Sequence, residues 1–377
     1  MSQVNLLEFN VKVLRFLNLW PRKNGATHGI WRTLKDFFLV FYVTPSFMSV
    51  TIGLYYELLG MFYVVVCFVR NRDDIITLVD QLSDFEEFGR PPDLLKTDKE
   101  ASMFTGFFLI YGLIGTLVYA SMPFVSIQYC EKNKSQYMED VGVPCGLVIT
   151  RFFLPFRFDF TPRKEIVTFY QLTICITFST TISALTMLLC GMLMHITTQL
   201  RYLGEKFGNL KNSHGDAILK DVRDCIRFHI AIILYATKTN QAFGSMMLLH
   251  ITVTSFVISI LGYQVLLTDN YTDSLRYGLH LGGWLSILFL VCYNGQNLID
   301  ESTMISRKAY FSAWFNFPTS VQKDVLLVIE RAQRPLTLTA LNFGVMSLQT
   351  YLQVVSITQK LIFSHIQTQL VQIRTLV

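Results

Sequence analysis

Long apolar blocks alternate with charged stretches along the whole chain, and this segregation limits the folds open to it. The blocks cover residues 37–69, 103–129, 166–196, 245–267, 275–293 and 336–363. A helix needs roughly 20 apolar residues to cross a hydrocarbon core of ~30 Å. Because lipid offers no hydrogen bonds to an open backbone, spanning segments of this kind are helical. The sequence therefore predicts an all-α, polytopic membrane protein, although only 51% of its 377 residues are hydrophobic.

The first block, residues 37–69, is longer than one membrane span needs and shorter than two spans need. Pro45 and Gly53 offer places to turn, so we divide the region into spans over 32–49 and 51–70, the second continuing as a polar helix over 71–85. This division gives seven transmembrane helices in all.

The distribution of basic residues predicts the orientation of these seven spans. Of the 32 Lys and Arg residues, 23 fall on the side that receives the N-terminus. Basic residues concentrate in cytoplasmic loops, so we expect a cytoplasmic N-terminus and an extracellular C-terminus. Both N-x-S/T sequons, at Asn133 and Asn270, then lie in extracellular loops, where glycosylation can occur.

The chain divides into six regions on this plan. They are a cytoplasmic amphipathic segment (1–30), transmembrane helices 1–4 (31–196), a cytoplasmic helical extension (197–244), transmembrane helices 5–6 (245–293), a cytoplasmic helix (294–335), and helix 7 with a short extracellular tail (336–377).

Two of these regions have an amphipathic helical pattern, and the apolar face of each has two possible environments. In the first, the apolar side chains Leu6, Phe9, Val13, Leu17 and Trp20 share one side of a helix. That face suits a membrane interface, or packing against the ends of other helices. The helix over 318–334 likewise has an apolar face, which either packs within the chain or forms a subunit interface.

A polar stripe runs along the last span. Gln349, Gln353, Ser356 and Lys360 are spaced by four, three and four residues, so they share one helical face. Lipid cannot satisfy such groups, so the stripe faces either neighbouring helices or water. The first alternative is a buried polar seam; the second is a pore lined by several subunits.

The seven cysteines have no metal-ligand spacing. Cys130 and Cys145 share one loop and can form a disulfide if that loop is extracellular. The sequence contains no HExxH, GxSxG, P-loop or dinucleotide motif. We therefore expect no enzyme, no catalytic residue, no metal, no cofactor and no nucleic-acid partner.

The C-terminal half carries a series of short motifs in a characteristic order. They are Cys292-Tyr293-Asn294-Gly295-Gln296, Glu301-Ser302, Ala309-Tyr310, Trp314, Pro318, the run Arg331-Ala332-Gln333-Arg334-Pro335-Leu336-Thr337-Leu338-Thr339-Ala340, and Ser347-Leu348-Gln349-Thr350. In these motifs the chain resembles the insect odorant receptors. Leu19-Trp20-Pro21 and Leu154-Pro155-Phe156 add weaker support.

The resemblance implies an odorant-gated cation channel in the plasma membrane of olfactory neuron dendrites, built as a heterotetramer with a shared co-receptor. It implies that Gln349, Gln353, Ser356 and Lys360 line the pore. It also implies a cytoplasmic anchor between subunits, to which we assign Tyr310, Trp314, Arg331, Arg334 and Pro335. The co-receptor carries a much longer loop between spans four and five than this chain does, so the resemblance favours an odorant-recognising subunit.

Such a receptor binds a small, volatile, apolar ligand in the outer half of each subunit. Our candidates for this pocket are Tyr119, Met122, Tyr170, Thr173, Thr177, Phe178, Tyr277, His280 and Trp284. The last three share a helix face, since they step by three and four residues. The alternative for the aromatic members is an interfacial belt at the membrane surface.

A gustatory receptor is the closest alternative. Thr350-Tyr351 matches the start of the gustatory terminal signature, but Ile357-Thr358 stands where that signature has Gln-Phe.

Overall fold

The computed structural model describes residues 6–17, 19–20, 62–125, 127–132, 145, 160–210, 216–267, 271–341 and 343–360. This part of the chain is nearly all helical, and its only β-type pairing is an isolated bridge between Thr339 and Val345. The named helices are α1 (Glu8–Phe16), α4 (Arg72–Gln81), η1 (Asp84–Phe88), α5 (Leu94–Val125), α6 (Ile127–Lys132), α8 (Arg163–Asn209), α9 (Asp216–Leu267), α10 (Tyr271–Tyr310), η3 (Trp314–Asn316) and α11 (Thr319–Ala332). Residues 62–70 and 348–360 are also helical.

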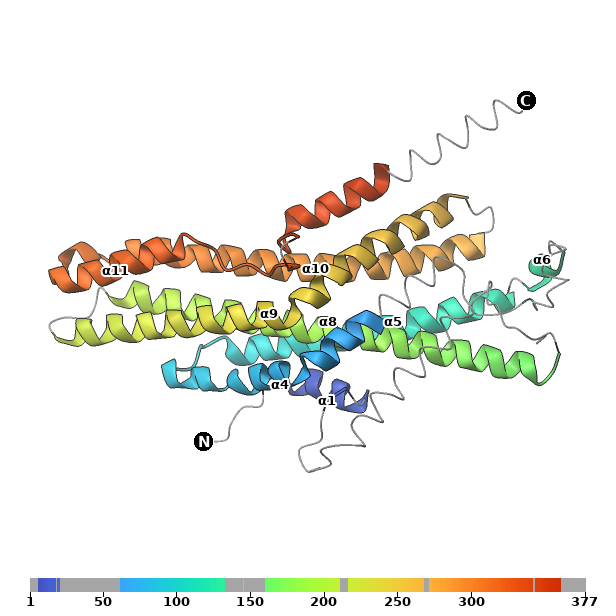
Figure 1. Cartoon of the computed structure of the whole chain (residues 1–377), viewed down its shortest axis with the longest axis horizontal. Coiled ribbons are helices and arrows are strands. Elements are labelled where there is room, and N and C mark those ends of the chain that lie inside the picture. The colour runs from blue at the N-terminus through green and yellow to red at the C-terminus, as the bar shows by residue number, and fades with distance from the viewer. Residues whose placement is uncertain are drawn as a thin grey trace.

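The long helices run along one axis, with α11 at one end of the bundle and α6 at the other (Figure 1). Four of the described helices, α5, α8, α9 and α10, are long and apolar enough to cross a membrane. Regions 32–49 and most of 51–70, where we expected the first two spans, lie outside the described residues. So do both sequon asparagines, Asn133 and Asn270.

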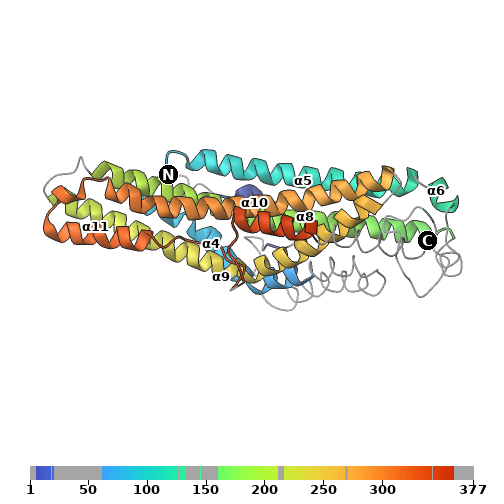
Figure 2. The same ribbon diagram turned by 90° about the horizontal axis from the view of Figure 1, so that it is seen from above.

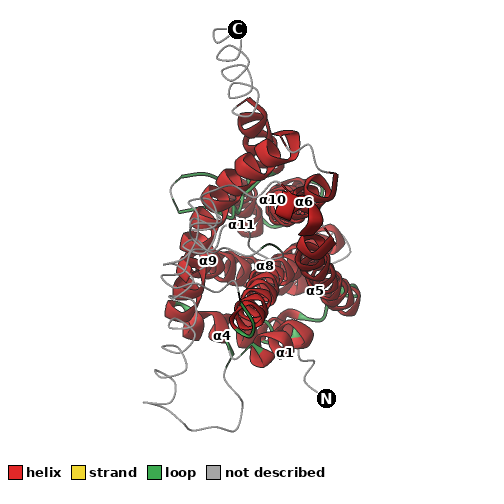
Figure 3. Ribbon diagram, turned by 90° about the vertical axis from the view of Figure 1, so that its right-hand side faces the viewer, coloured by secondary structure: helices red, strands yellow, loops and turns green. Residues whose placement is uncertain are grey.

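Helix α8 is the centre of the bundle. It packs against α1, α5, α9 and α10, and the end-on view places it between them (Figure 3). Residues 181–193 of α8 are buried at every position. A helix that is apolar all round is stable only when neighbours cover it on every side, which is the environment that α8 has here.

Helices α8, α9 and α10 continue without a break past the predicted membrane boundaries at 196, 244 and 293. The view from above shows α10 running alongside α5 near one end of the bundle and reaching α11 at the other (Figure 2). The helical extension that we expected over 197–244 is thus continuous with α8 and α9, and the region after 293 likewise begins as a continuation of α10 to Tyr310.

Helix α1 packs on α8 and α5. Its buried side chains include Leu7, Val11 and Leu14, while Phe9 is 39% exposed. The backbone N–H of Leu7 donates to Asp98 Oδ1 at 2.8 Å. Of the five residues predicted for the apolar face, Leu6 and Trp20 are buried, Val13 and Leu17 are partly buried against the core, and Phe9 alone is exposed.

The last helix begins at residue 348, not at 336 as we expected. Residues 336–347 form a tight turn in which Ala340 N–H donates to Gly344 O and Met346 N–H donates to Leu338 O, both at 2.8 Å. Asn240 on α9 accepts from Thr339 N–H at 2.7 Å. These bonds satisfy the backbone outside a helix, so the apolar composition of the segment does not make it helical.

Helix α11 packs its apolar face within the chain. Val321, Val325 and Val328 are buried, and the helix lies against α10 and α9. For this face the structure therefore gives the first of our two alternatives, packing inside one chain.

Candidate functional site

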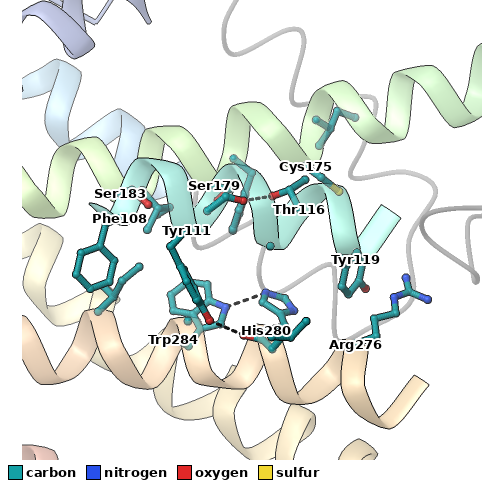
Figure 4. Close-up of a pocket in the computed structure, with 18 residues that line it drawn as sticks. Phe108, Tyr111, Thr116, Tyr119, Cys175, Ser179, Ser183, Arg276, His280 and Trp284 are labelled. Atoms are coloured by element: carbon teal, nitrogen blue, oxygen red, sulfur yellow. Dashed lines mark hydrogen bonds between the residues drawn. The ribbon is translucent and has the colours of Figure 1, made fainter. Parts of the chain in front are cut away.

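Helices α5, α8 and α10 line a partly open cavity of about 160 Å³ (Figure 4). Its walls are mostly apolar and aromatic, with a few hydroxyl groups, one imidazole and one guanidinium. The lining residues are Phe108, Tyr111, Gly112, Gly115, Thr116, Tyr119, Ile174, Cys175, Phe178, Ser179, Ile182, Ser183, Arg276, Leu279, His280, Gly283, Trp284 and Ile287. Small-molecule sites have this character: concave, largely apolar and equipped with few polar groups.

Helical periodicity brings the lining residues of α10 to one face. Arg276, His280, Trp284 and Ile287 step by four, four and three residues, so they point in one direction along the helix. One wall of the cavity is therefore a continuous row of side chains on α10, and the lining residues of α5 and α8 face it.

Small residues bring α5 close to α8 and still leave space between them. A Cβ atom at Gly112 would lie 2.5 Å from Ser179 Oγ, so this position tolerates no side chain without movement of Ser179. A Cβ atom at Gly115, one turn further, would meet nothing within 4 Å. The first glycine permits the close approach of the helices, and the second leaves volume to the cavity.

A hydrogen bond orders the aromatic wall. Trp284 Nε1–H donates to His280 Nε2 at 3.0 Å. The His280 ring meets the Tyr119 ring edge-to-face, with centroids 5.7 Å apart, and Trp284 meets Phe178 with centroids 6.4 Å apart. Aromatic pairs favour such edge-to-face arrangements, so the wall holds one shape.

Four of the nine residues predicted for the ligand site line this cavity: Tyr119, Phe178, His280 and Trp284. The other five are Met122, Tyr170, Thr173, Thr177 and Tyr277, and none of them is among the lining residues. Thr173 and Thr177 each donate a hydrogen bond to a carbonyl oxygen of their own helix, those of Phe169 and Thr173. Tyr277 packs against the core of the bundle.

Several lining residues were not predicted from the sequence, among them Tyr111, Gly115 and Arg276. Arg276 precedes His280 by four residues, and this spacing is the signal that could have identified it. The glycines carry no comparable signal, because their role depends on what the neighbouring helix places opposite them.

The polar stripe of the last helix lies on the surface of the single chain. Gln349, Gln353, Ser356 and Lys360 are all exposed, whereas Val354 and Thr358 on the other side of the helix are buried. The stripe is therefore not a polar seam against neighbouring helices of its own chain.

The residues assigned to the subunit anchor gather near α11. Tyr310 is 58% exposed and Trp314 is half-buried, while Arg331, Arg334 and Pro335 are exposed. Arg331 Nη1 donates to the carbonyl oxygen of Arg334 at 3.1 Å. The surface beside them also exposes Leu326 and Leu327.

Cys130 and Cys145 form a disulfide in the structure. Among the described residues no group of three or more His, Cys, Asp or Glu side chains is arranged to hold a metal ion. The cavity itself offers shape, aromatic surface and a few hydrogen bonds, which suits reversible binding of a small organic molecule.

Comparisons of this chain with known proteins agree on one family. A family model described as 7tm Odorant receptor matches residues 47–358. Odorant receptor 85f of Drosophila melanogaster is 24% identical over 169 residues, which cover 45% of this chain and 43% of that protein. The odorant receptor coreceptor of Ooceraea biroi is 26% identical over 141 residues, covering 35% of this chain and 29% of that one. The matched segments thus span less than half the length of these relatives.

The fold has a counterpart among solved structures. The insect olfactory receptor OR5 from Machilis hrabei in complex with eugenol superposes with a TM-score of 0.80 at 16% identity, over 95% of this chain and 97% of that one. A second structure of the same receptor gives a TM-score of 0.79 at 15% identity, over 96% of this chain and 97% of that one. At this identity the likeness establishes the fold. The family model, which matches most of the 377 residues, establishes that this chain belongs to the 7tm Odorant receptor family.

Proposed function

We propose that this chain is the odorant-recognising subunit of a ligand-gated, non-selective cation channel in the plasma membrane, assembled as a heterotetramer with an odorant co-receptor. The observation that carries the proposal is the cavity between α5, α8 and α10. It is aromatic-lined and of about 160 Å³, the scale of a small organic molecule. Eugenol, named with the similar OR5 structure, is such a molecule.

In this proposal the chain has seven spans, a cytoplasmic N-terminus and an extracellular C-terminus. The cavity lies toward the outer side, and the end of the bundle that carries α11 forms the cytoplasmic anchor. The exposed polar face of residues 348–360 lines a pore shared with other subunits. Exposure of Gln353 and Ser356 on one chain supports this role, since a polar face in a membrane needs water or a partner.

The co-receptor is a partner in the proposal because a protein of that name is among the relatives. The match to the odorant receptor model along residues 47–358 favours this function over the gustatory alternative.

The test is whole-cell current in cells that express the chain with and without an insect co-receptor, using a panel of volatiles. We expect cation current that requires both chains and a volatile. Surface labelling of both chains accompanies every recording. If both chains reach the surface and soluble tastants open the channel while no volatile does, the gustatory alternative replaces the proposal.

A matched pair of variants on α8 connects the current to the cavity. Phe178 lines the cavity, whereas Phe169, two and a half turns earlier, is 71% exposed and does not. We expect Phe178→Ala to raise the half-effective concentration of an active volatile about 10-fold, because loss of an aromatic contact with the ligand costs about 1.5 kcal/mol. Phe169→Ala should leave it unchanged. Equal effects of the two variants would place the ligand elsewhere.

A further inference from the structure

One buried cation stands in the wall of the cavity. Among the eighteen described residues that line it, Arg276 alone carries a permanent charge, and its side chain is only 2% exposed. Burial of a charge away from water is costly unless hydrogen bonds or other charges compensate for it. Arg276 has interactions within the chain, and as a lining residue it also places a positive charge at the edge of the cavity.

Aromatic rings hold this guanidinium in place. Its Cζ atom lies 3.8 Å from the centroid of the Tyr119 ring and 5.9 Å from that of Tyr277. Cation–π contacts of this kind use the flat face of the guanidinium. Its five N–H donors lie in the plane of the group, so it can donate to a ligand as well as to partners within the protein.

His280 adds a second donor to the same end of the cavity. Because its Nε2 accepts the hydrogen bond of Trp284 Nε1–H, the imidazole is neutral and its proton is on Nδ1. Both polar side chains nearest Tyr119 thus offer N–H groups. A carbonyl oxygen accepts directly from these N–H groups. A ligand hydroxyl also needs an acceptor for its own proton, and among the lining side chains at this end only hydroxyl oxygens, such as those of Thr116 and Tyr119, offer one.

The opposite end of the cavity is mostly apolar, with the hydroxyl of Ser183 beside Phe108 (Figure 4). Ile287 follows Arg276 by eleven residues on α10, and Phe108 precedes Tyr119 by eleven on α5, which is about 16 Å along each helix. Figure 4 shows Phe108 at one end and Arg276 with Tyr119 at the other, with Trp284 and His280 between them. A bound molecule is therefore offered donors at one end and hydrocarbon surface at the other.

The volume indicates the size of molecule that the cavity can hold. The cavity of about 160 Å³ is close to the ~150 Å³ of an engineered protein cavity that takes up benzene. One ring with a short substituent, or an aliphatic chain of similar volume, fills such a space.

We propose that the odorant of this receptor is a small carbonyl compound, an aryl or short-chain ketone, aldehyde or ester. Its oxygen accepts a hydrogen bond from Arg276, and its hydrocarbon part points toward Phe108. Arg276 is then the residue that selects the chemical class of the ligand. This inference rests on the proposed function and makes it more specific.

The test uses pairs of volatiles that differ only by exchange of C=O for C=CH2. Acetophenone with α-methylstyrene, and benzaldehyde with styrene, are pairs of nearly identical shape. On cells that express this chain with a co-receptor, we expect the carbonyl member to be about 10- to 100-fold more potent by half-effective concentration, the range of a hydrogen bond to a charged group.

Variants assign the difference to one side chain. Arg276→Met keeps an unbranched apolar stem but removes the guanidinium and its charge. It should bring the potencies of the two members of a pair to within about 3-fold of each other, mainly by lowering the potency of the carbonyl member. Arg163→Met is the matched control: Arg163 also lies over an aromatic ring, Phe160, at 4.8 Å, but it does not line the cavity. This control should preserve the ratio.

The outcomes separate the inference from the proposed function. Equal potency of the two members on the unmodified chain overturns the inference, and the currents themselves still support odorant gating. Activation by other volatiles but by no small carbonyl compound overturns it as well. Absence of any volatile response, with both chains at the surface, overturns both proposals. If Arg276→Met does not reach the surface, the ratio on the unmodified chain decides.

Discussion

The two ends of α10 are packed in opposite ways. Over its first four turns most side chains are only partly buried, and a Cβ atom at Gly278 would meet nothing within 4 Å. From Leu288 onward one face of the helix is tightly packed: Leu288, Val291 and Cys292 are fully buried, whereas Phe289 and Tyr293 on the other face are exposed. At Gly295 the helix touches backbone, since a Cβ atom there would lie 2.1 Å from the carbonyl oxygen of Met346.

The two ends of α10 therefore have different structural roles. The loosely packed end leaves volume for a small molecule, and the tightly packed end holds the turn over residues 336–347 that leads into the last helix. Native cores have few voids larger than a water molecule, and close packing stabilises them. Because the cavity lies at one end of α10, we expect the packing at its other end to contribute more to stability. Substitutions at the two ends should therefore affect different properties.

The largest effect is expected from Gly295→Ala. The new methyl group would overlap the Met346 carbonyl, and a backbone atom cannot rotate away as a side chain can. We expect a loss of about 3 kcal/mol, the upper end of the usual cost of overpacking, seen as a lower thermal unfolding temperature in detergent and less protein at the surface. Gly278→Ala on the same helix is the control and should be neutral or slightly stabilising. Similar melting of the two variants would mean that the ends of α10 are not packed differently.

A smaller loss is expected from Asn240→Ala. Asn240 accepts from Thr339 N–H at 2.7 Å and donates to Thr339 Oγ1 at 3.0 Å, so its removal leaves partly buried polar groups without these bonds. The cost should be about 1–3 kcal/mol, with ligand potency among the surviving channels unchanged. Asn209→Ala, at the exposed end of α8, should cost nothing measurable. A shift in odorant selectivity for Asn240→Ala would show that the turn and the cavity are coupled.

The smallest effect on stability, and a selective effect on ligands, is expected from Gly115→Ala. Its methyl group enters the cavity without a clash. The largest active volatile should lose about 3- to 10-fold in potency, because overpacking a bound ligand costs on the order of 1 kcal/mol, while smaller ones keep theirs. Gly278→Ala, outside the cavity wall, again serves as the control. Equal losses for large and small volatiles would indicate a general defect rather than a change of cavity size.

Hydrophobic blocks in the sequence predicted the long helices because their signal is local. The apolar runs at 166–196 and 275–293 lie within α8 and α10, and the periodic residues of 197–244 continue α8 and α9. The turn at 336–347 could not be predicted in this way. Its backbone is held by Asn240, almost a hundred residues earlier, and no local pattern reports a partner at that distance.

The candidate site was predictable to the extent that it depends on helix faces. His280 and Trp284 share a face by their spacing, and both line the cavity. Thr173 and Thr177 have plausible polarity but bond to their own helix. The burial of Arg276 could not be predicted from spacing, because its guanidinium packs on the ring of Tyr119 from another helix.

The continuity of α8, α9 and α10 has a consequence for how the protein unfolds. At 1.5 Å per residue, helices of 47, 52 and 40 residues extend over about 70, 78 and 60 Å. A hydrocarbon core of ~30 Å covers at most half of any of them. One helix thus experiences two solvents: its aqueous part is stabilised by exclusion of water, and its lipid part by close packing and hydrogen bonds. Urea acts on surface exposed to water, so it should melt the aqueous end while the other end stays folded, and denaturation of this protein is then not a single all-or-none transition.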